Sequence, residues 1–278
     1  MSSGLIYLRN RYYDPSIGRF ITEDPARDGL NWYVYCANNP INFIDPLGLV
    51  LTPEEAAALS DHIYQDIPLS DPNDPEGNRA LRTVSGWRLT SVWTGSESMK
   101  MGFYIRDTDD WRNPTEYVVV FRGSIIEWNM ETADVWKNNI EQAISSKSAD
   151  MWEAIGFSKE FVARVGDIEV TFVGHSKGGA EALAAAVAND KNAIVFNPAK
   201  PNLQDYNLSA DNYNGNATSY VVRGEILNNL FGEPGVGQVE YLDQQYKTPW
   251  YFMGDTRKIA NAVNSIRNHL MDAVLLGI

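Results

Sequence analysis

From about residue 50 onward, short apolar runs alternate with segments whose apolar positions recur at helical spacing. The runs are rich in Val, Ile, Phe and Trp, which favour strands. Strands are predicted at 87–93, 101–106, 117–122, 168–173, 193–196 and 220–223. Helices are predicted at 52–64, 130–145, 150–165, 178–188 and 257–276. Strands alternating with helices indicate an α/β fold, with a mostly parallel sheet and helices on both faces.

The first 49 residues have a different pattern. Short alternating runs such as 5–8 and 32–35 are separated by Asp-Pro and Asn-Pro pairs, which are typical of turns. This predicts a β-rich segment of short strands, too short to bury a core without further sheet. We therefore expect two parts, residues 1–49 and residues 50–278.

Charge and composition exclude several classes of function. The chain of 278 residues carries a net charge of −13, so it has no basic footprint for nucleic acid and should not adsorb to anionic lipid by charge alone. Cys36 is the single cysteine, which excludes an intrachain disulfide. No signal peptide and no run of roughly 20 apolar residues is evident. No His, Asp and Glu cluster has metal-ligand spacing, so we expect neither a metal nor a cofactor.

The pattern G-x-S-x-G occurs at residues 174–178, between a β-branched strand and an Ala-rich helix. A serine on such a strand-to-helix turn needs small neighbours, which Gly174 and Gly178 supply. The turn presents the hydroxyl at the carboxyl end of the sheet, beside a helix N-terminus. We interpret Ser176 as a nucleophile, with His175 as its neighbour in the turn. The alternative is a glycine-rich turn without chemistry.

A serine hydroxyl needs a base, and the chain has three histidines. His175 adjoins Ser176, so its ring cannot easily turn back to the hydroxyl. His62 lies upstream of Ser176, whereas His269 lies downstream, as the usual order of serine, acid and histidine requires. His269 is therefore the expected base, and a histidine on a helix surface is the alternative.

The third member of the triad should lie between Ser176 and His269, just after a strand. Glu225 follows the predicted strand 220–223 almost directly and is the preferred acid. Asp243 is the second choice. Asp211 and Asp255 lie in loop-like sequence and rank lower.

An oxyanion hole needs two backbone donors. The amide of Lys177, directly after the nucleophile, should supply one. The other should come from a loop after an earlier strand, and Ser124 follows the buried-type strand 117–122. The segment 124–140 beyond it holds Trp128 and Trp136, so it is expected to form either a helix packed on the sheet or an amphipathic flap that opens on lipid.

Three motifs together resemble the class 3 lipases and their bacterial relatives: FRGS at 121–124, GHSKGG at 174–179 and FNP at 196–198. An acidic-Trp element of that family could be Glu127-Trp128 or Asp134-Val135-Trp136. The family's acid is normally Asp, so Glu225 would be a departure. The resemblance implies ester hydrolysis through an acyl-serine, with membrane phospholipid as substrate. Other acyl hydrolases (thioesterase, peptidase or acyltransferase) and a binding domain with a vestigial elbow remain alternatives.

The first 49 residues resemble the end of an Rhs-repeat-associated core, by YYDP at 12–15, GRF at 18–20, DP at 24–25 and DPLGL at 45–49. The resemblance implies a toxin released from a β-shell by cleavage between Leu49 and Val50, with Asp24 and Asp45 as an aspartic-protease-like pair. It also implies a secreted antibacterial effector, delivered to the periplasm or membrane surface of a target bacterium. Its partners would be the Rhs shell of a longer parent and a cognate immunity protein.

Overall fold

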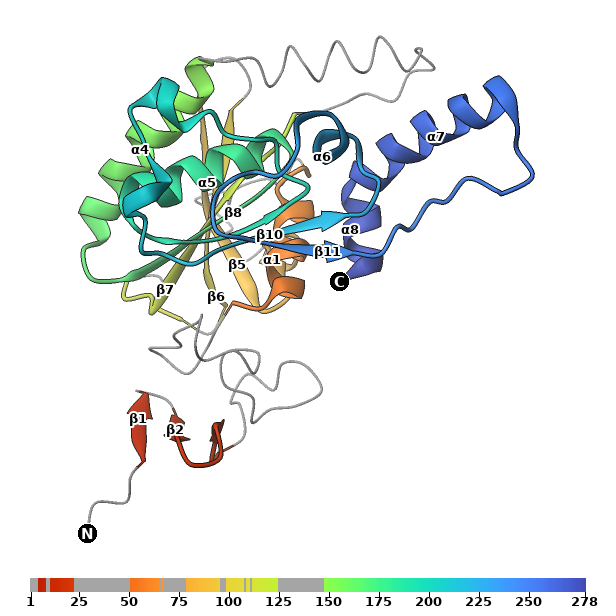
Figure 1. The fold of residues 1–278 in the computed structure, drawn as a ribbon. Coiled ribbons are helices and arrows are strands. Elements are labelled where there is room, and N and C mark those ends of the chain that lie inside the picture. Colours follow the sequence, from red (N-terminus) through yellow and green to blue (C-terminus); the bar gives the residue numbers. More distant parts are fainter. Residues whose placement is uncertain are drawn as a thin grey trace. The chain divides into compact units, whose positions relative to one another are not determined.

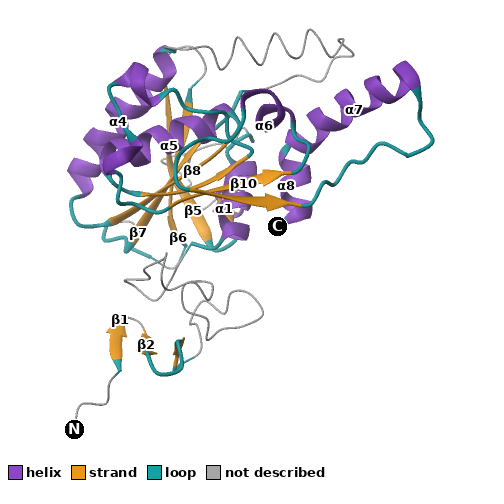
Figure 2. Ribbon diagram, viewed as in Figure 1, coloured by secondary structure: helices purple, strands orange, loops and turns teal. Residues whose placement is uncertain are grey.

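The computed structural model describes residues 5–8, 11–22, 51–65, 67, 79–95, 99–107, 109–110, 112–124 and 148–278. Its contacts divide the chain into two compact units, Met1–Glu55 and Ala56–Ile278. This division falls six residues after the predicted boundary between Leu49 and Val50, which stays a prediction. Figures 1 and 2 show the elements of both units.

The first unit contains a small antiparallel sheet of β1 (Ile6–Leu8), β2 (Arg11–Asp14) and β3 (Arg19–Phe20). The turn between β2 and β3 is held by the Asp14 carboxylate, which accepts from the Ser16 amide at 2.8 Å and from its hydroxyl at 2.6 Å. The sequence predicted such short strands and turns. The predicted cleavage residues Asp24, Asp45, Leu49 and Val50 lie outside the described residues.

The second unit is built on an eight-stranded sheet in the order β11-β10-β9-β8-β7-β6-β5-β4. The five strands from β7 to β11 are parallel, and β4 to β7 are antiparallel. The strands are β4 (Thr83–Val84), β5 (Trp87–Thr94), β6 (Lys100–Arg106), β7 (Glu116–Phe121), β8 (Glu169–His175), β9 (Asn192–Phe196), β10 (Ala217–Val222) and β11 (Gln238–Leu242).

Two helices precede these strands, and the others lie between and after them. The helices are α1 (Pro53–His62), α2 (Arg79–Arg82), α4 (Ala149–Val165), α5 (Lys177–Asn189), α6 (Ile226–Phe231), α7 (Gly254–His269) and α8 (Met271–Gly277), with 3-10 turns η2 (Leu203–Tyr206) and η3 (Ala210–Asn212). The predicted start of α1 is confirmed, because the Thr52 and Glu55 side chains each bond the other's amide, at 3.2 and 3.0 Å. The predicted helix at 130–145 lies outside the described residues.

Helices cover both faces of the large sheet. Side chains of a strand alternate between faces, so Gly102 and Phe103 in β6 face opposite ways. A side chain at Gly102 would collide with Ile63 from the end of α1, whereas Phe103 stacks on Phe161 of α4 at 4.9 Å between ring centroids. Helix α5 shares the Phe103 side through the same buried cluster. The predicted α/β architecture is confirmed.

The predicted helix 257–276 is wrong in one respect, because it is two helices. Leu270 has extended backbone (φ −68°, ψ 157°) and separates α7 from α8. The break coincides with side-chain capping. The carbonyl oxygens of Asn268 and His269 accept hydrogen bonds from the Asn197 side chain, at 3.1 and 3.0 Å. These carbonyls have no partner inside α7, so the bonds to Asn197 stabilise the helix end at His269.

Candidate functional site

Ser176 lies on the turn between β8 and α5. Strand β8 is near the middle of the large sheet, and Figure 2 shows it beside α5. The Ser176 backbone has φ 58° and ψ −126°, a conformation that costs a non-glycine residue about 1–3 kcal/mol. A side chain at Gly174 would collide with the carbonyl oxygen of Gly178, and one at Gly178 with that of Phe121. The two glycines are therefore required for the turn, as the sequence predicted.

A chain of hydrogen bonds joins Ser176, His269 and Glu225. The His269 Nε2 lies 2.9 Å from the Ser176 Oγ, and its Nδ1 lies 2.8 Å from the Glu225 Oε2. All three side chains are buried. An ionised carboxylate can only accept, so Nδ1 carries the proton and donates to Glu225. Nε2 is then the acceptor for the Ser176 hydroxyl, which is the tautomer that a general base requires.

Glu225 is held by the start of α6, for which it is the N-cap. Its Oε2 also accepts from the Leu227 amide at 2.8 Å, and its Oε1 accepts from the Asn228 amide. These bonds fix the carboxylate relative to the imidazole. By contrast, Asp243 is exposed on the loop after β11. Asp211 and Asp255 bond instead to Ser209 and Lys258 respectively.

His175 does not face the Ser176 hydroxyl, as expected. Its Nε2 donates to the His269 carbonyl oxygen at 2.7 Å, and its Nδ1 accepts from the Tyr64 hydroxyl at 2.9 Å. Burial, together with a smaller effect of the neighbouring His269, lowers the pKa of His175 to about 3. His175 is therefore neutral, and its two hydrogen bonds link the segment after α1 to the end of α7. His62 is also structural, bonding the Tyr104 hydroxyl and the Leu81 carbonyl, both at 2.9 Å.

Tyr64 links His175 to the loop after β7. Its hydroxyl accepts from the Gly123 amide, and burial raises the pKa of the phenol, so it stays protonated. A side chain at Gly123 would collide with the Tyr64 hydroxyl and with the His175 carbonyl oxygen. The loop containing Gly123 and Ser124 therefore packs closely against the turn at residues 174–178. Ser124, Ser176, His269, Leu270 and Met271 line one cavity of about 190 Å³.

Lys177 opens α5, so its amide is one of those without an acceptor inside the helix. Its side chain points elsewhere: it pairs with Asp150 of α4, and lies 3.6 Å from Glu181 one turn along α5. Both carboxyl groups are fully buried. Burial raises the pKa of Glu181 to about 8, against the opposing effect of Lys177. The pair with Asp150 therefore anchors the elbow helix to α4.

Asn197 is a site residue that the sequence marked only as part of the FNP motif. It directly follows β9 and is fully buried with φ 40°. Its Oδ1 accepts from the Val222 amide at 2.8 Å, in addition to the two bonds that its Nδ2 donates to the end of α7. It thereby ties β10, which leads to Glu225, to the helix end that carries His269.

Within the described residues, no group of three or more His, Cys, Asp or Glu could hold a metal ion. No helix in the described part of the chain is long and apolar enough to cross a membrane.

Comparison with curated proteins finds matches that cover only a short part of this chain and of each relative. Putative uncharacterized protein YlbH of Escherichia coli K12 is 52% identical over 58 residues, which are 20% of this chain and 24% of YlbH. Double-stranded DNA deaminase toxin A of Burkholderia cenocepacia H111 is 50% identical over 50 residues, which are 17% of this chain and 3% of the toxin. The chain thus spans less than a quarter of the length of these relatives.

Among solved structures, the Rhizomucor miehei lipase propeptide complex matches 97% of this chain and 88% of its own, with a TM-score of 0.45 and 12% identity. A family model described as phospholipase-like, the Tle-like phospholipase domain, matches residues 55–267. The family model and the match to a toxin confirm the sequence resemblance to a toxin fused to a lipase-like domain. Because the family model matches more than half of its length, this chain belongs to the Tle-like phospholipase family.

Proposed function

We propose that this chain is the lipid-hydrolysing part of an Rhs-type antibacterial toxin, and that Ser176, His269 and Glu225 form its catalytic triad. The observation that carries the proposal is the continuous set of hydrogen bonds from the Ser176 Oγ through the His269 imidazole to the Glu225 carboxylate. It is the arrangement in which a buried acid orients a base that activates a serine.

In the first half of the reaction, the Ser176 Oγ attacks the ester carbonyl carbon while its proton passes to the His269 Nε2. The tetrahedral intermediate collapses when the imidazolium gives this proton to the leaving alcohol oxygen, leaving an acyl-Ser176 ester. In the second half, a water gives a proton to the His269 Nε2 as it attacks the acyl carbon. The second tetrahedral intermediate collapses when the imidazolium returns this proton to the Ser176 Oγ, which releases the fatty acid and restores the serine. Glu225 stabilises the imidazolium throughout and is not itself protonated.

The developing oxyanion would be bound by two backbone amides, those of Lys177 and Ser124. Support comes from their placement: Lys177 begins α5, and Ser124 lines the cavity that contains the Ser176 side chain. The bond from Gly123 to Tyr64 holds the Ser124 loop in place. Preorganised donors of this kind need no rearrangement when charge develops.

The family and the toxin match support a proposal for the substrate and the target. Membership of a phospholipase family favours membrane phospholipid as the ester, and the match to a bacterial toxin favours a role in killing a rival bacterium. Delivery into that cell, an Rhs shell in the longer parent and a cognate immunity protein are part of the same proposal. A thioesterase, peptidase or acyltransferase would use the same triad on another acyl group.

Phospholipid in vesicles should be hydrolysed far faster than a soluble short-chain ester at equal ester concentration. The measurement is fatty acid release from vesicles against turnover of a short nitrophenyl ester by the 278-residue chain. Labelling by a fluorophosphonate probe, abolished in Ser176→Ala, would establish that the serine is reactive in either case. Labelling with turnover of only the soluble ester would instead favour a soluble-ester or thioester hydrolase.

A second prediction concerns release of the toxin. In the longer parent, the chain should be cut between Leu49 and Val50, one carboxylate of Asp24 and Asp45 activating water while the other polarises the peptide carbonyl. Intact-mass analysis should show a fragment that begins at Val50. Cleavage that persisted in an Asp45→Asn parent would contradict the aspartyl mechanism. The isolated chain is expected to stay uncut without the shell that fixes both carboxylates.

A further inference from the structure

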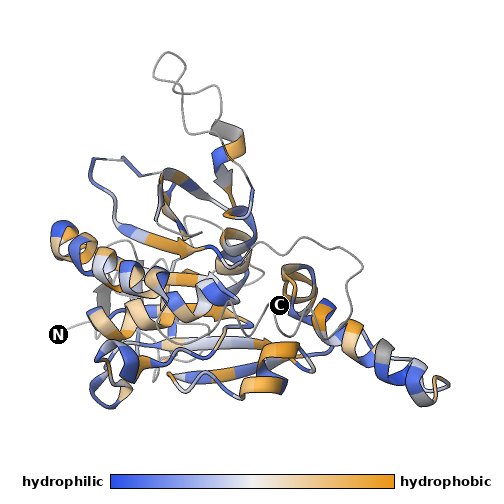
Figure 3. Cartoon of the chain, turned by 90° about the horizontal axis from the view of Figure 1, so that it is seen from above, coloured by the Kyte–Doolittle hydropathy of each residue, from blue (hydrophilic) through white to orange (hydrophobic). Residues whose placement is uncertain are grey.

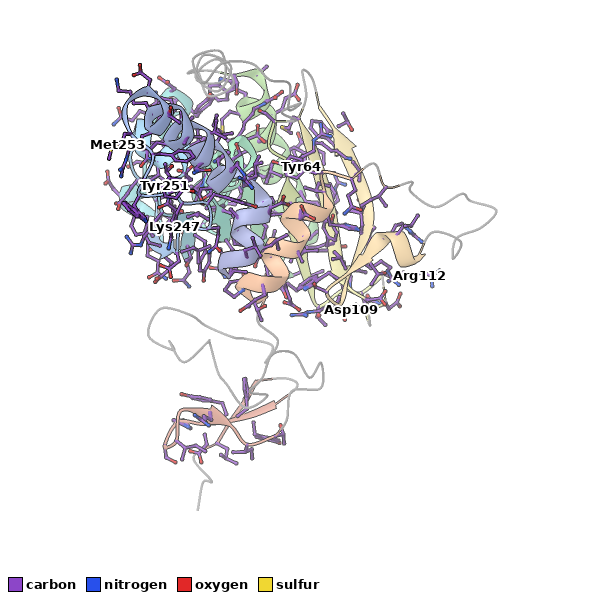
Figure 4. The ribbon with its side chains drawn as sticks, turned by 90° about the vertical axis from the view of Figure 1, so that its right-hand side faces the viewer. Tyr64, Asp109, Arg112, Lys247, Tyr251 and Met253 are labelled. Carbon is purple, nitrogen blue, oxygen red and sulfur yellow. The ribbon has the colours of Figure 1, made fainter. Side chains whose placement is uncertain are left out.

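The segment that joins β11 to α7 carries an unusual group of exposed side chains. We call residues 247–258, which comprise the end of this segment and the first turn of α7, the docking loop. In the second unit it lies at the far end of α7 from the sheet (Figures 1 and 3), and Lys247, Tyr251 and Met253 lie along the same edge in Figure 4. Trp250, Tyr251 and Met253 have exposed fractions of 83%, 62% and 77%.

Backbone hydrogen bonds hold the docking loop in the conformation that exposes these side chains. The Phe252 amide donates to the Pro249 carbonyl at 3.1 Å, and the Arg257 amide donates to the Met253 carbonyl at 3.3 Å. Phe252 is half-buried and lines a groove of about 460 Å³ against α7, together with Pro249, Ala260 and Val263. The loop thus partly buries Phe252 and leaves Trp250, Tyr251 and Met253 in solvent. Stability of the fold does not explain this exposure of large apolar side chains.

Charge in the docking loop opposes that of the rest of the chain. It contains three basic residues, Lys247, Arg257 and Lys258, and one acidic residue, Asp255, so its net charge is 3 − 1 = +2, whereas the whole chain carries −13. All four side chains are exposed. The ion pair between Lys258 and Asp255, at 3.2 Å, is exposed on both sides and leaves the lysine available to other anions.

We infer that the docking loop binds the surface of an anionic bilayer, with Trp250, Tyr251 and Met253 entering the interface and Lys247, Arg257 and Lys258 contacting lipid phosphates. Tryptophan and tyrosine suit this position, because their rings are apolar while their N–H and O–H groups reach water and headgroups. Each basic residue near an anionic surface adds attraction that an otherwise acidic protein lacks. Charge complementarity is what selects a lipid surface over a neutral apolar partner.

The position of the loop relates binding to the site. Helix α7 has 16 residues and ends at His269, so it places the loop about 24 Å along its axis from the proposed base. The groove lined by Phe252 and Val263 also contains Lys247 and Arg267, two residues before His269. Anchoring at one end of this rigid helix would hold the cavity at Ser176 close to the lipid. The binding step itself does not depend on the proposed hydrolysis.

The test is flotation of the full chain, in a Ser176→Ala background, with vesicles of phosphatidylcholine alone or with three parts in ten phosphatidylglycerol. The chain should float with the anionic vesicles and much less with neutral ones, and 0.5 M salt should weaken binding. Trp250→Ser combined with Met253→Ser should reduce the partition coefficient at least tenfold. Lys247→Gln with Lys258→Gln should abolish the preference for anionic vesicles.

Trp152→Ser is the matched control, since this tryptophan of α4 is 47% exposed and lies outside the loop. It should leave flotation unchanged, and every variant in the active background should keep its turnover of a soluble ester. Flotation that neither loop variant changed would overturn the inference. The same result is expected if the loop binds a protein rather than lipid. Binding without any ester turnover in the active chain would instead refute the proposed hydrolysis and leave the docking surface standing.

Discussion

Ser176→Ala is expected to lower kcat for ester hydrolysis by roughly 10⁴-fold or more, and His269→Ala to have a similar effect. The Ser176 hydroxyl bonds the His269 ring at 2.9 Å, so removing either side chain removes the nucleophile or its activation. Residues of a triad act as a unit, and the double variant should therefore cost little more than either single one. The measurement is kcat on a soluble ester, with toxicity on expression as a second readout.

Stability separates this effect from misfolding. Alanine has the same backbone constraints as serine at φ 58°, so Ser176→Ala should keep the melting temperature within a few degrees. Ser158→Ala, at a buried serine of α4, is the matched control and should keep full activity. A His269→Ala variant that retained more than a small fraction of the rate, with the fold intact, would show that another group serves as base.

The sequence predicted the parts of the site that have a local pattern. Short apolar runs that alternate with helical segments predicted the central strands. The pattern G-x-S-x-G between a strand and a helix identified the turn that carries Ser176. Chain order then pointed to His269, and the position directly after β10 pointed to Glu225. Each inference used either a period along the chain or a position relative to a strand end, which are properties that neighbouring residues determine.

What the sequence did not predict depends on contacts between distant residues. The bond from His175 to the His269 carbonyl spans 94 positions, and the bond from Tyr64 to His175 spans 111. Asn197, directly after β9, caps the end of α7, and periodicity alone therefore predicted one helix over residues 257–276. The pairing of Lys177 with Asp150 likewise appears only when α4 packs on α5. Such contacts leave no local signal.

Glu225→Gln should lower kcat by about 10³- to 10⁴-fold on a soluble ester while KM changes little. Glutamine removes the negative charge that stabilises the imidazolium, and its amide group can reverse the hydrogen bond that fixes the tautomer of His269. The side-chain oxygen of glutamine can still accept one of the amide bonds at the start of α6. The loss of stability should therefore stay within the roughly 0.5–2 kcal/mol typical of a lost N-cap.

Asp243→Asn is the matched control, because this carboxylate also follows a parallel strand, directly after β11, but is exposed. It should change kcat less than about twofold, as expected of a surface substitution away from the reacting groups. Glu225→Asp tests reach: the shorter side chain keeps the charge, and partial activity in it would show that charge rather than the cap is what matters. If Asp243→Asn were the damaging change and Glu225→Gln the mild one, the acid would be Asp243, and the bond between His269 and Glu225 would be a cap without a catalytic role.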